Sequence, residues 1–172
     1  EARGHRVCAT REPTDGPYGR RIRAAARSGD APTASEELAW FMADRAEHVV
    51  AVIEPALARG EVVVSDRYFL STVAYQGARG IPVDDILTHS ESSFPLPDLA
   101  LLLVMDATRG LARAAGRGDA AEPLFEEASF LTRVADVFAR IERPYIVRID
   151  AARDPDSVTA DLLRALEKRL GL

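Results

Sequence analysis

The chain has 172 residues, 47% of them hydrophobic and 28% charged, which excludes intrinsic disorder and collagen-like repeats. Its one cysteine, Cys8, excludes an internal disulfide framework, and its longest apolar run, Leu99–Met105, is far shorter than the about 20 residues that span a bilayer. The net charge of −5 and a pI near 5.3 argue against nucleic-acid and membrane partners, and no leader-like segment opens the chain, so we expect a cytoplasmic protein.

Short apolar runs alternate with segments of helical periodicity. In chain order they predict a strand at His5–Thr10, a helix at Glu36–Arg59, strands at Glu61–Ser65 and Leu99–Met105, a helix at Leu124–Ile141, a strand at Pro144–Asp150 and a last helix opened by Asp154 and Pro155. A capping box formed by Thr33 and Glu36 begins the first helix, and Gly60 ends it. Because apolar strands alternate with helices, we expect one α/β domain around a parallel sheet covered on both faces.

Two arginines, Arg11 and Arg67, occupy the same position in a short sequence pattern that occurs twice in the chain. Each follows an Ala-Arg-Gly tripeptide and a predicted strand, so each lies just past a strand's carboxyl end. Ligands of open parallel sheets bind outside these ends, and two guanidinium groups there suit a phosphate. Coincidence combined with surface salt bridges is the alternative interpretation.

Phe41 and Arg45 lie four positions apart and therefore share a face of the first predicted helix. An arginine beside an apolar stripe needs an acceptor, and an aromatic ring next to it suits a flat base that carries a carbonyl group. The alternative is a core phenylalanine with the arginine in an ion pair to Glu37 or Asp44.

The strand before Arg67 also delivers Asp66 to the same edge of the sheet. This carboxylate could hold Mg²⁺ through water or orient an attacking oxygen. Tyr75, Gln76 and Gly77 follow on a predicted helix that faces the same crevice, although simple packing and a turn would also account for them.

Three arginines, Arg109, Arg113 and Arg117, are spaced by four and would repel one another on one helix face. An anion that visits the row would relieve this repulsion, and Gly116 and Gly118 would let the segment close like a lid. A solvated face relieved by nearby acids is the alternative.

Six motifs follow one another in a characteristic order and spacing: Thr10-Arg11-Glu12-Pro13, Phe41-Met42-Ala43-Asp44-Arg45, Asp66-Arg67-Tyr68, Ala74-Tyr75-Gln76-Gly77, Pro97-Asp98-Leu99 and Phe125-Glu126. Together they resemble the thymidylate kinase family. The resemblance implies a P-loop NTPase-like three-layer α/β/α fold with a five-stranded parallel sheet, and one nucleoside-monophosphate-kinase-like domain over residues 1–172 with a lid at about 109–123. It also implies a homodimer that uses Mg²⁺ to move the γ-phosphate of ATP to dTMP, a step of dTTP biosynthesis.

The resemblance implies a role for each matching residue at the substrate. Arg11 and Arg67 would hold the dTMP phosphate. Phe41 would stack on thymine, and Arg45 would bond its O4 carbonyl.

Further roles follow for the sugar and for catalysis. Tyr75 would crowd the 2′ position of the sugar and so favour deoxyribose, while Gln76 would help to fix the base. Asp66 would act near the magnesium ion and the attacking phosphate oxygen, and the lid arginines Arg113 and Arg117 would reach the transferred phosphoryl group.

One departure from the family concerns the glycine-rich P-loop, G-x-x-x-x-G-K-[ST], which is nowhere in the sequence. Lys168 is the only lysine and has no glycine frame, so it cannot replace the lysine of that loop. We expect the P-loop and the family's central first strand to lie upstream of Glu1, and the 172-residue chain to be inactive by itself.

Two smaller departures affect the site. Thr14-Asp15 replaces a glycine pair, which could shift the loop beside the phosphate, and Pro123-Leu124 stands where the lid usually carries an Asp-Arg pair. Two other functions stay open: a non-catalytic nucleotide-binding or dimerisation module, and a kinase for another nucleoside monophosphate.

Overall fold

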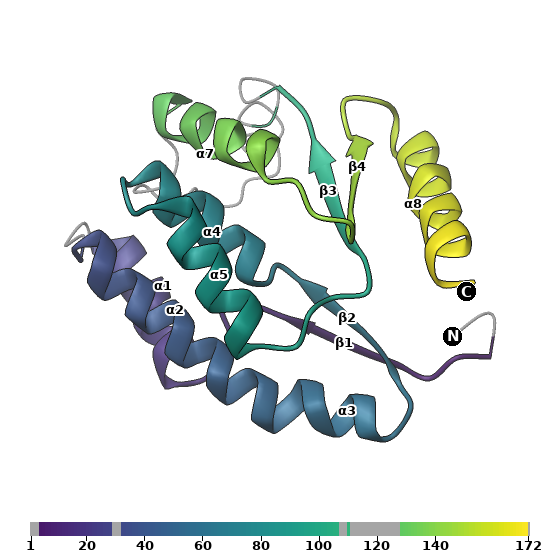
Figure 1. The fold of residues 1–172 in the computed structure, drawn as a ribbon, viewed down its shortest axis with the longest axis horizontal. Helices are drawn as coiled ribbons and strands as arrows, with labels where there is room; N and C mark the ends of the chain where they lie inside the picture. The colour runs from purple at the N-terminus through teal and green to yellow at the C-terminus, as the bar shows by residue number, and fades with distance from the viewer. Residues whose placement is uncertain (1–3, 29–31, 107–109, 111–127, 172) are drawn as a thin grey trace. The chain divides into compact units, whose positions relative to one another are not determined.

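The computed structural model describes residues 4–28, 32–106, 110 and 128–171 (Figure 1). The chain divides into two compact units. The larger unit comprises Glu1–Pro95 and Glu122–Phe138, and the smaller unit comprises Leu96–Ala121 and Ala139–Leu172.

Strands and helices alternate as the sequence predicts. The elements are β1 (Val7–Arg11), α1 (Pro17–Ser28), α2 (Ala34–His48), a π-helical segment η1 (Val49–Ile53), α3 (Glu54–Ala58), β2 (Val62–Asp66), α4 (Phe69–Ala78), α5 (Val83–Ser93), β3 (Ala100–Val104), α7 (Ala128–Arg140), β4 (Ile146–Asp150) and α8 (Pro155–Leu170). Each predicted strand is confirmed to within two residues at either end. None of the described helices is long and apolar enough to cross a membrane.

The pairing of the strands confirms a parallel α/β fold. In the larger unit β1 pairs with β2, and in the smaller unit β3 pairs with β4, both in parallel. The described strands thus form two two-stranded sheets. The central first strand that the family resemblance implies has no counterpart among the described residues. The prediction of a sheet covered on both faces holds only in part, because Val64 on β2 is 54% exposed.

The predicted helix at Glu36–Arg59 is confirmed as the continuous run α2–η1–α3 (Figure 1). The Thr33 hydroxyl accepts from the Glu36 backbone N–H at 3.2 Å, and the Glu36 carboxylate accepts from the Thr33 N–H at 3.0 Å, which completes the predicted capping box. The run ends before Gly60, whose φ of +70° is easily adopted only by glycine. The sequence did not predict the π-helical segment Val49–Ile53.

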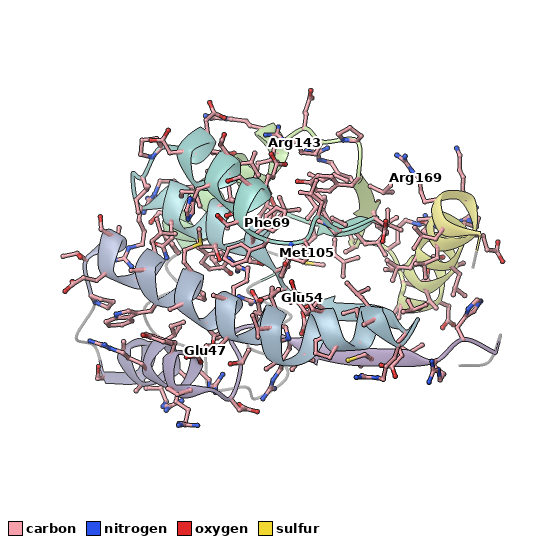
Figure 2. The ribbon with its side chains drawn as sticks, turned by 60° about the horizontal axis from the view of Figure 1, so that its bottom comes forward. Glu47, Glu54, Phe69, Met105, Arg143 and Arg169 are labelled. Atoms are coloured by element: carbon pink, nitrogen blue, oxygen red, sulfur yellow. The ribbon has the colours of Figure 1, made fainter. Side chains whose placement is uncertain are left out.

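Helices cover the larger unit's core. Figure 2 shows Glu47 and Glu54 spaced along the long helix and Phe69 in α4. The apolar residues that α1, η1, α4, α5 and α7 bury in this unit are Ile22, Ala26, Val49, Ile53, Phe69, Leu70, Val73, Ala74, Ile86, Leu87, Phe130 and Val134. Helix α2 packs against both α1 and α4.

The smaller unit packs α8 against β4. The buried apolar side chains among its described residues are Ile141, Ile146, Ile149 and Ala151. The Asp154 carboxylate accepts the Ser157 backbone N–H at 2.9 Å with Pro155 at the first helical turn, which confirms the predicted start of this helix.

Candidate functional site

The two strand-end arginines lie side by side, as their place in the sequence predicts. Parallel pairing sets Arg11 opposite Asp66, and the Glu12 backbone N–H donates to the Asp66 carbonyl at 3.0 Å. Arg67 follows directly. All three charged side chains, Arg11, Asp66 and Arg67, are exposed, so this edge of the sheet can receive an anion.

Arg67 has a backbone conformation that non-glycine residues rarely adopt. Its φ is +66°, and the Ser65 hydroxyl donates to its carbonyl at 2.7 Å. A left-handed conformation costs a residue with a side chain about 1 kcal/mol, and such strain gathers at functional sites. The guanidinium carbon lies 5.6 Å from the centroid of the Tyr75 ring. Arg67, predicted to bind the phosphate, therefore lies beside Tyr75, predicted to contact the sugar.

Arg45 is a buried cation with only 1% of its surface exposed. Its Nε and Nη2 donate to Glu12 Oε2 at 2.9 and 2.6 Å, and Nη2 also donates to Thr72 Oγ1 at 2.9 Å. Its Nη1 has, among the described residues, only the Met42 sulfur as an acceptor, at 3.8 Å. Because thioether sulfur is a weak acceptor, the Nη1 end can still donate to a ligand.

Aromatic rings surround this guanidinium. Its carbon lies 5.2 Å from the Tyr68 ring centroid and 5.5 Å from that of Phe94. Phe41 lies one turn before Arg45 on α2 and is half-buried. Burial first, and the neighbouring Glu12 carboxylate second, raise the pKa of Tyr68 to about 12, so its phenol stays neutral at physiological pH.

The ion-pair partner of Arg45 differs from the one that helical spacing suggests. Glu37 and Asp44 are on the same helix, yet the buried pair forms with Glu12, which directly follows β1. Glu12 also accepts from His48 Nδ1 at 2.9 Å through its other oxygen. Sequence reasoning missed Glu12 and His48 as site residues, and only the Arg-Glu-Pro motif pointed to Glu12.

Glu37 instead organises a second buried cluster. Its carboxylate accepts from Gln76 Nε2 at 2.6 Å and forms an ion pair with Arg79, which also donates to the Pro32 carbonyl at 2.6 Å. Gln76 is completely buried. The Gln76 amide, predicted to fix the base, is therefore held by Glu37 through its nitrogen, and its Oε1 has no hydrogen-bond partner among the described residues.

Asp44 anchors the loop in which Thr14-Asp15 replaces the family's glycine pair. It is 1% exposed and accepts from the Thr14 backbone N–H at 2.8 Å and from the Thr14 hydroxyl at 2.6 Å. A Cβ on Gly19 would lie 1.9 Å from the Thr14 carbonyl oxygen, so α1 also packs closely on this loop. The Asp15 carboxylate lies 3.4 Å from Arg11 and 2.8 Å from Arg23.

The remaining predicted site features concern the lid and the metal. Arg113, Arg117 and all but Gly110 of the predicted lid at 109–123 lie outside the described residues. The described part of the chain holds no cluster of three His, Cys, Asp or Glu that could bind a metal by protein ligands alone. Asp66 by itself still fits Mg²⁺, which proteins hold through one or two carboxylates with water and substrate phosphates as the other ligands.

Comparison with known proteins bears on these observations. A sequence model of the family described as thymidylate kinase matches residues 1–162. The chain is 45% identical over 174 aligned positions to the thymidylate kinase of Xanthomonas campestris pv. campestris, covering 99% of this chain and 75% of that protein. It is 42% identical over 170 positions to the thymidylate kinase of Desulfotalea psychrophila, covering 98% of this chain and 83% of the relative. The chain belongs to the thymidylate kinase family, whose members are phosphotransferases.

Proposed function

We propose that this chain binds dTMP as the acceptor in a cytoplasmic, Mg²⁺-dependent transfer of the γ-phosphoryl group of ATP, a step of dTTP biosynthesis. It does so as a single nucleoside-monophosphate-kinase-like domain with a lid at about 109–123. Family membership and the names of the relatives support the reaction. The choice of dTMP depends on the arrangement around Arg45.

The buried Arg45 guanidinium is the observation that carries the proposal. Three of its N–H groups are already used by Glu12 and Thr72, while the Nη1 end meets only a sulfur acceptor within the part of the chain that the structure describes. Thymine offers a carbonyl oxygen at C4, where cytosine carries an amino group that cannot accept from a guanidinium. With the Phe41 ring one turn away, the face fits a flat base with a carbonyl at that position.

The phosphate end of the ligand fits the strand-end arginines. Arg11 and Arg67 each directly precede a residue that contacts Arg45, namely Glu12 and Tyr68. At each of two neighbouring strand ends, the arginine proposed to bind the phosphate is therefore followed directly by a residue that contacts the base-recognising Arg45. Arginine binds phosphate through paired N–H groups, which suits a nucleoside 5′-monophosphate.

The catalytic roles are proposals of the same kind. Asp66 would hold Mg²⁺ through water, and the ion would supply charge neutralisation of the phosphates. Arg113 and Arg117 would bring positive charge to the transferred group, and Tyr75, in contact with Arg67, would exclude a 2′-hydroxyl.

Ligand-dependent thermal stability tests the substrate. Titration of the 172-residue chain with dTMP, dUMP, dGMP and AMP should raise its melting temperature most with dTMP, because only the folded state binds. Phe41→Ala should abolish that rise while the free protein stays folded. The matched control Phe138→Ala removes a half-buried ring from α7 and should retain the rise. An unchanged rise in Phe41→Ala, or a larger rise with a purine nucleotide, would refute the assignment.

An assay of transfer separates an enzyme from a binding module. The 172-residue chain contains no glycine-rich lysine loop to hold the ATP phosphates, so we expect it to bind dTMP and to form no dTDP from ATP. Formation of dTDP by this chain would contradict the expectation.

A further inference from the structure

We propose that Glu12, His48 and Thr72 are positioning residues for base recognition: they hold the Arg45 guanidinium so that its Nη1 end stays available to a base carbonyl. The inference rests on the proposed function, and it assigns roles to residues that need not touch the ligand. The four groups involved beside Arg45 are Thr10, Glu12, His48 and Thr72.

The Glu12 carboxylate divides its two oxygens between two partners. Oε2 accepts both Nε and Nη2 of Arg45, and Oε1 accepts from His48 Nδ1 at 2.9 Å. A carboxylate with both oxygens free usually pairs with arginine as a fork, and the end-on fork uses Nη1 together with Nη2. Because His48 occupies Oε1, Glu12 binds only the Nε side of the guanidinium.

His48 is fixed from its other side as well. It is 3% exposed, and its Nε2 lies 2.7 Å from the Thr10 hydroxyl on β1. A carboxylate oxygen accepts, so the contact with Glu12 assigns a donated proton to Nδ1, while Nε2 stays within hydrogen-bond distance of the Thr10 hydroxyl. The ring therefore cannot turn away from Glu12 without losing both of its hydrogen bonds.

Thr72 completes the arrangement on α4. Its Oγ1 accepts from Nη2 at 2.9 Å, so Nη2 has one acceptor in Glu12 and another in Thr72. With Nε and Nη2 both satisfied and the whole side chain buried, Nη1 is the part of Arg45 that gains most from a ligand acceptor.

Paired substitutions of His48 separate the positioning role from a merely structural one. His48→Asn can still donate to Glu12 from near the Nδ1 position, whereas His48→Gln reaches toward Thr10 and loses the Glu12 contact. Both are neutral amides of similar polarity. The readout is binding of dUMP, dCMP and deoxyribose 5-phosphate, since dUMP and dCMP differ at C4 and the sugar phosphate has no base.

We expect the preference for dUMP over dCMP to fall about tenfold in His48→Gln and to persist in His48→Asn, with deoxyribose 5-phosphate binding unchanged in both. Equal preference in the two variants, or a loss of sugar-phosphate binding together with the preference, would overturn the positioning role. If His48→Gln does not fold, Thr72→Val and Thr72→Ser serve as the second pair. The isosteric valine should lose the preference and serine should keep it; a valine variant that keeps it would refute the inference.

The same binding measurements would show separately whether the proposed function itself is wrong. In that case the unmodified chain itself would show no preference for dUMP over dCMP and would bind dTMP no more tightly than deoxyribose 5-phosphate.

Discussion

Glu12, Glu37 and Asp44 are carboxylates with at most 6% exposure, and each is met by donors from other elements. Burying an acid is costly unless hydrogen bonds and opposite charges compensate for lost water. Glu12 joins the end of β1 to α2, Glu37 joins α2 to α4, and Asp44 joins α2 to the loop before α1. The candidate site is thus built around paired acids that a single helix, α2, brings together.

Asp15 provides a test at the level of one residue. Its exposed carboxylate lies near Arg11 and Arg23, where it competes with a phosphate for the Arg11 guanidinium. Asp15→Asn should therefore tighten dTMP binding by about threefold at low salt, which is the magnitude of an exposed ion pair, and the gain should shrink as salt is added. Isothermal titration would measure it. Asp84→Asn removes an equal charge from an exposed position of α5 and should leave dTMP binding unchanged. Weaker dTMP binding by Asp15→Asn would contradict the competition.

At the level of elements, the long helix determines where Phe41 and Arg45 lie. The helix begins at the Thr33–Glu36 capping box and ends before Gly60, and both signals are visible in the sequence. The ends of the strands are likewise visible in the sequence. Helices α1 and α5 were not predicted individually, although Pro17 at the start of α1 and the four-residue spacing of Ile22 and Ala26 are signals for the first. The π-helical segment has no local signal, because it depends on how the helix packs along its length.

The capping box of this helix makes a prediction about pH. Hydrogen bonds from the Thr33 side chain and backbone lower the pKa of Glu36 from its ordinary value of 4.5. The contribution of this acid to stability is therefore fully present above pH 4.5 and is lost as the pH falls through the lowered pKa of the folded state. Thr33→Ala should lower the free energy of unfolding by about 1 kcal/mol at neutral pH, and by less once Glu36 is protonated.

Denaturant unfolding at several pH values would measure this difference. Glu36→Gln retains a side chain that completes a capping box and does not titrate, so it should remove the pH dependence and keep the effect of Thr33→Ala. A Thr33→Ala effect that is equally large below the pKa of Glu36 would show that the carboxylate is not part of the cap.

At the scale of the whole molecule, we expect the homodimer that the family resemblance implies to form through the long helix. Val50 is 68% exposed and Leu57 is 47% exposed on this helix, and we expect the partner chain to pack on these two apolar side chains. Val50→Glu should convert a dimer to a monomer in sedimentation velocity. Leu163→Glu places the same charge at a 49% exposed leucine of α8 and should leave the dimer intact. A monomeric unmodified chain, or a dimeric Val50→Glu, would contradict this surface.

The amino-acid pattern alone predicts the α/β class, the four strands, the caps of the long helix and the last helix, and the placement of Arg11, Asp66 and Arg67 at one sheet edge. The strands and caps depend on residues a few positions apart, whose periodicity and capping chemistry are visible locally. The shared sheet edge follows from the alternation of strands and helices, which predicts parallel strands with their carboxyl ends on one side. Which donor meets which buried acid depends instead on the packing of distant elements: Arg45 pairs with Glu12, Gln76 with Glu37, and Thr14 with Asp44. These partners are about 30 to 40 positions apart, and desolvation forces each buried charge to pair with whatever the packing of other elements brings within reach.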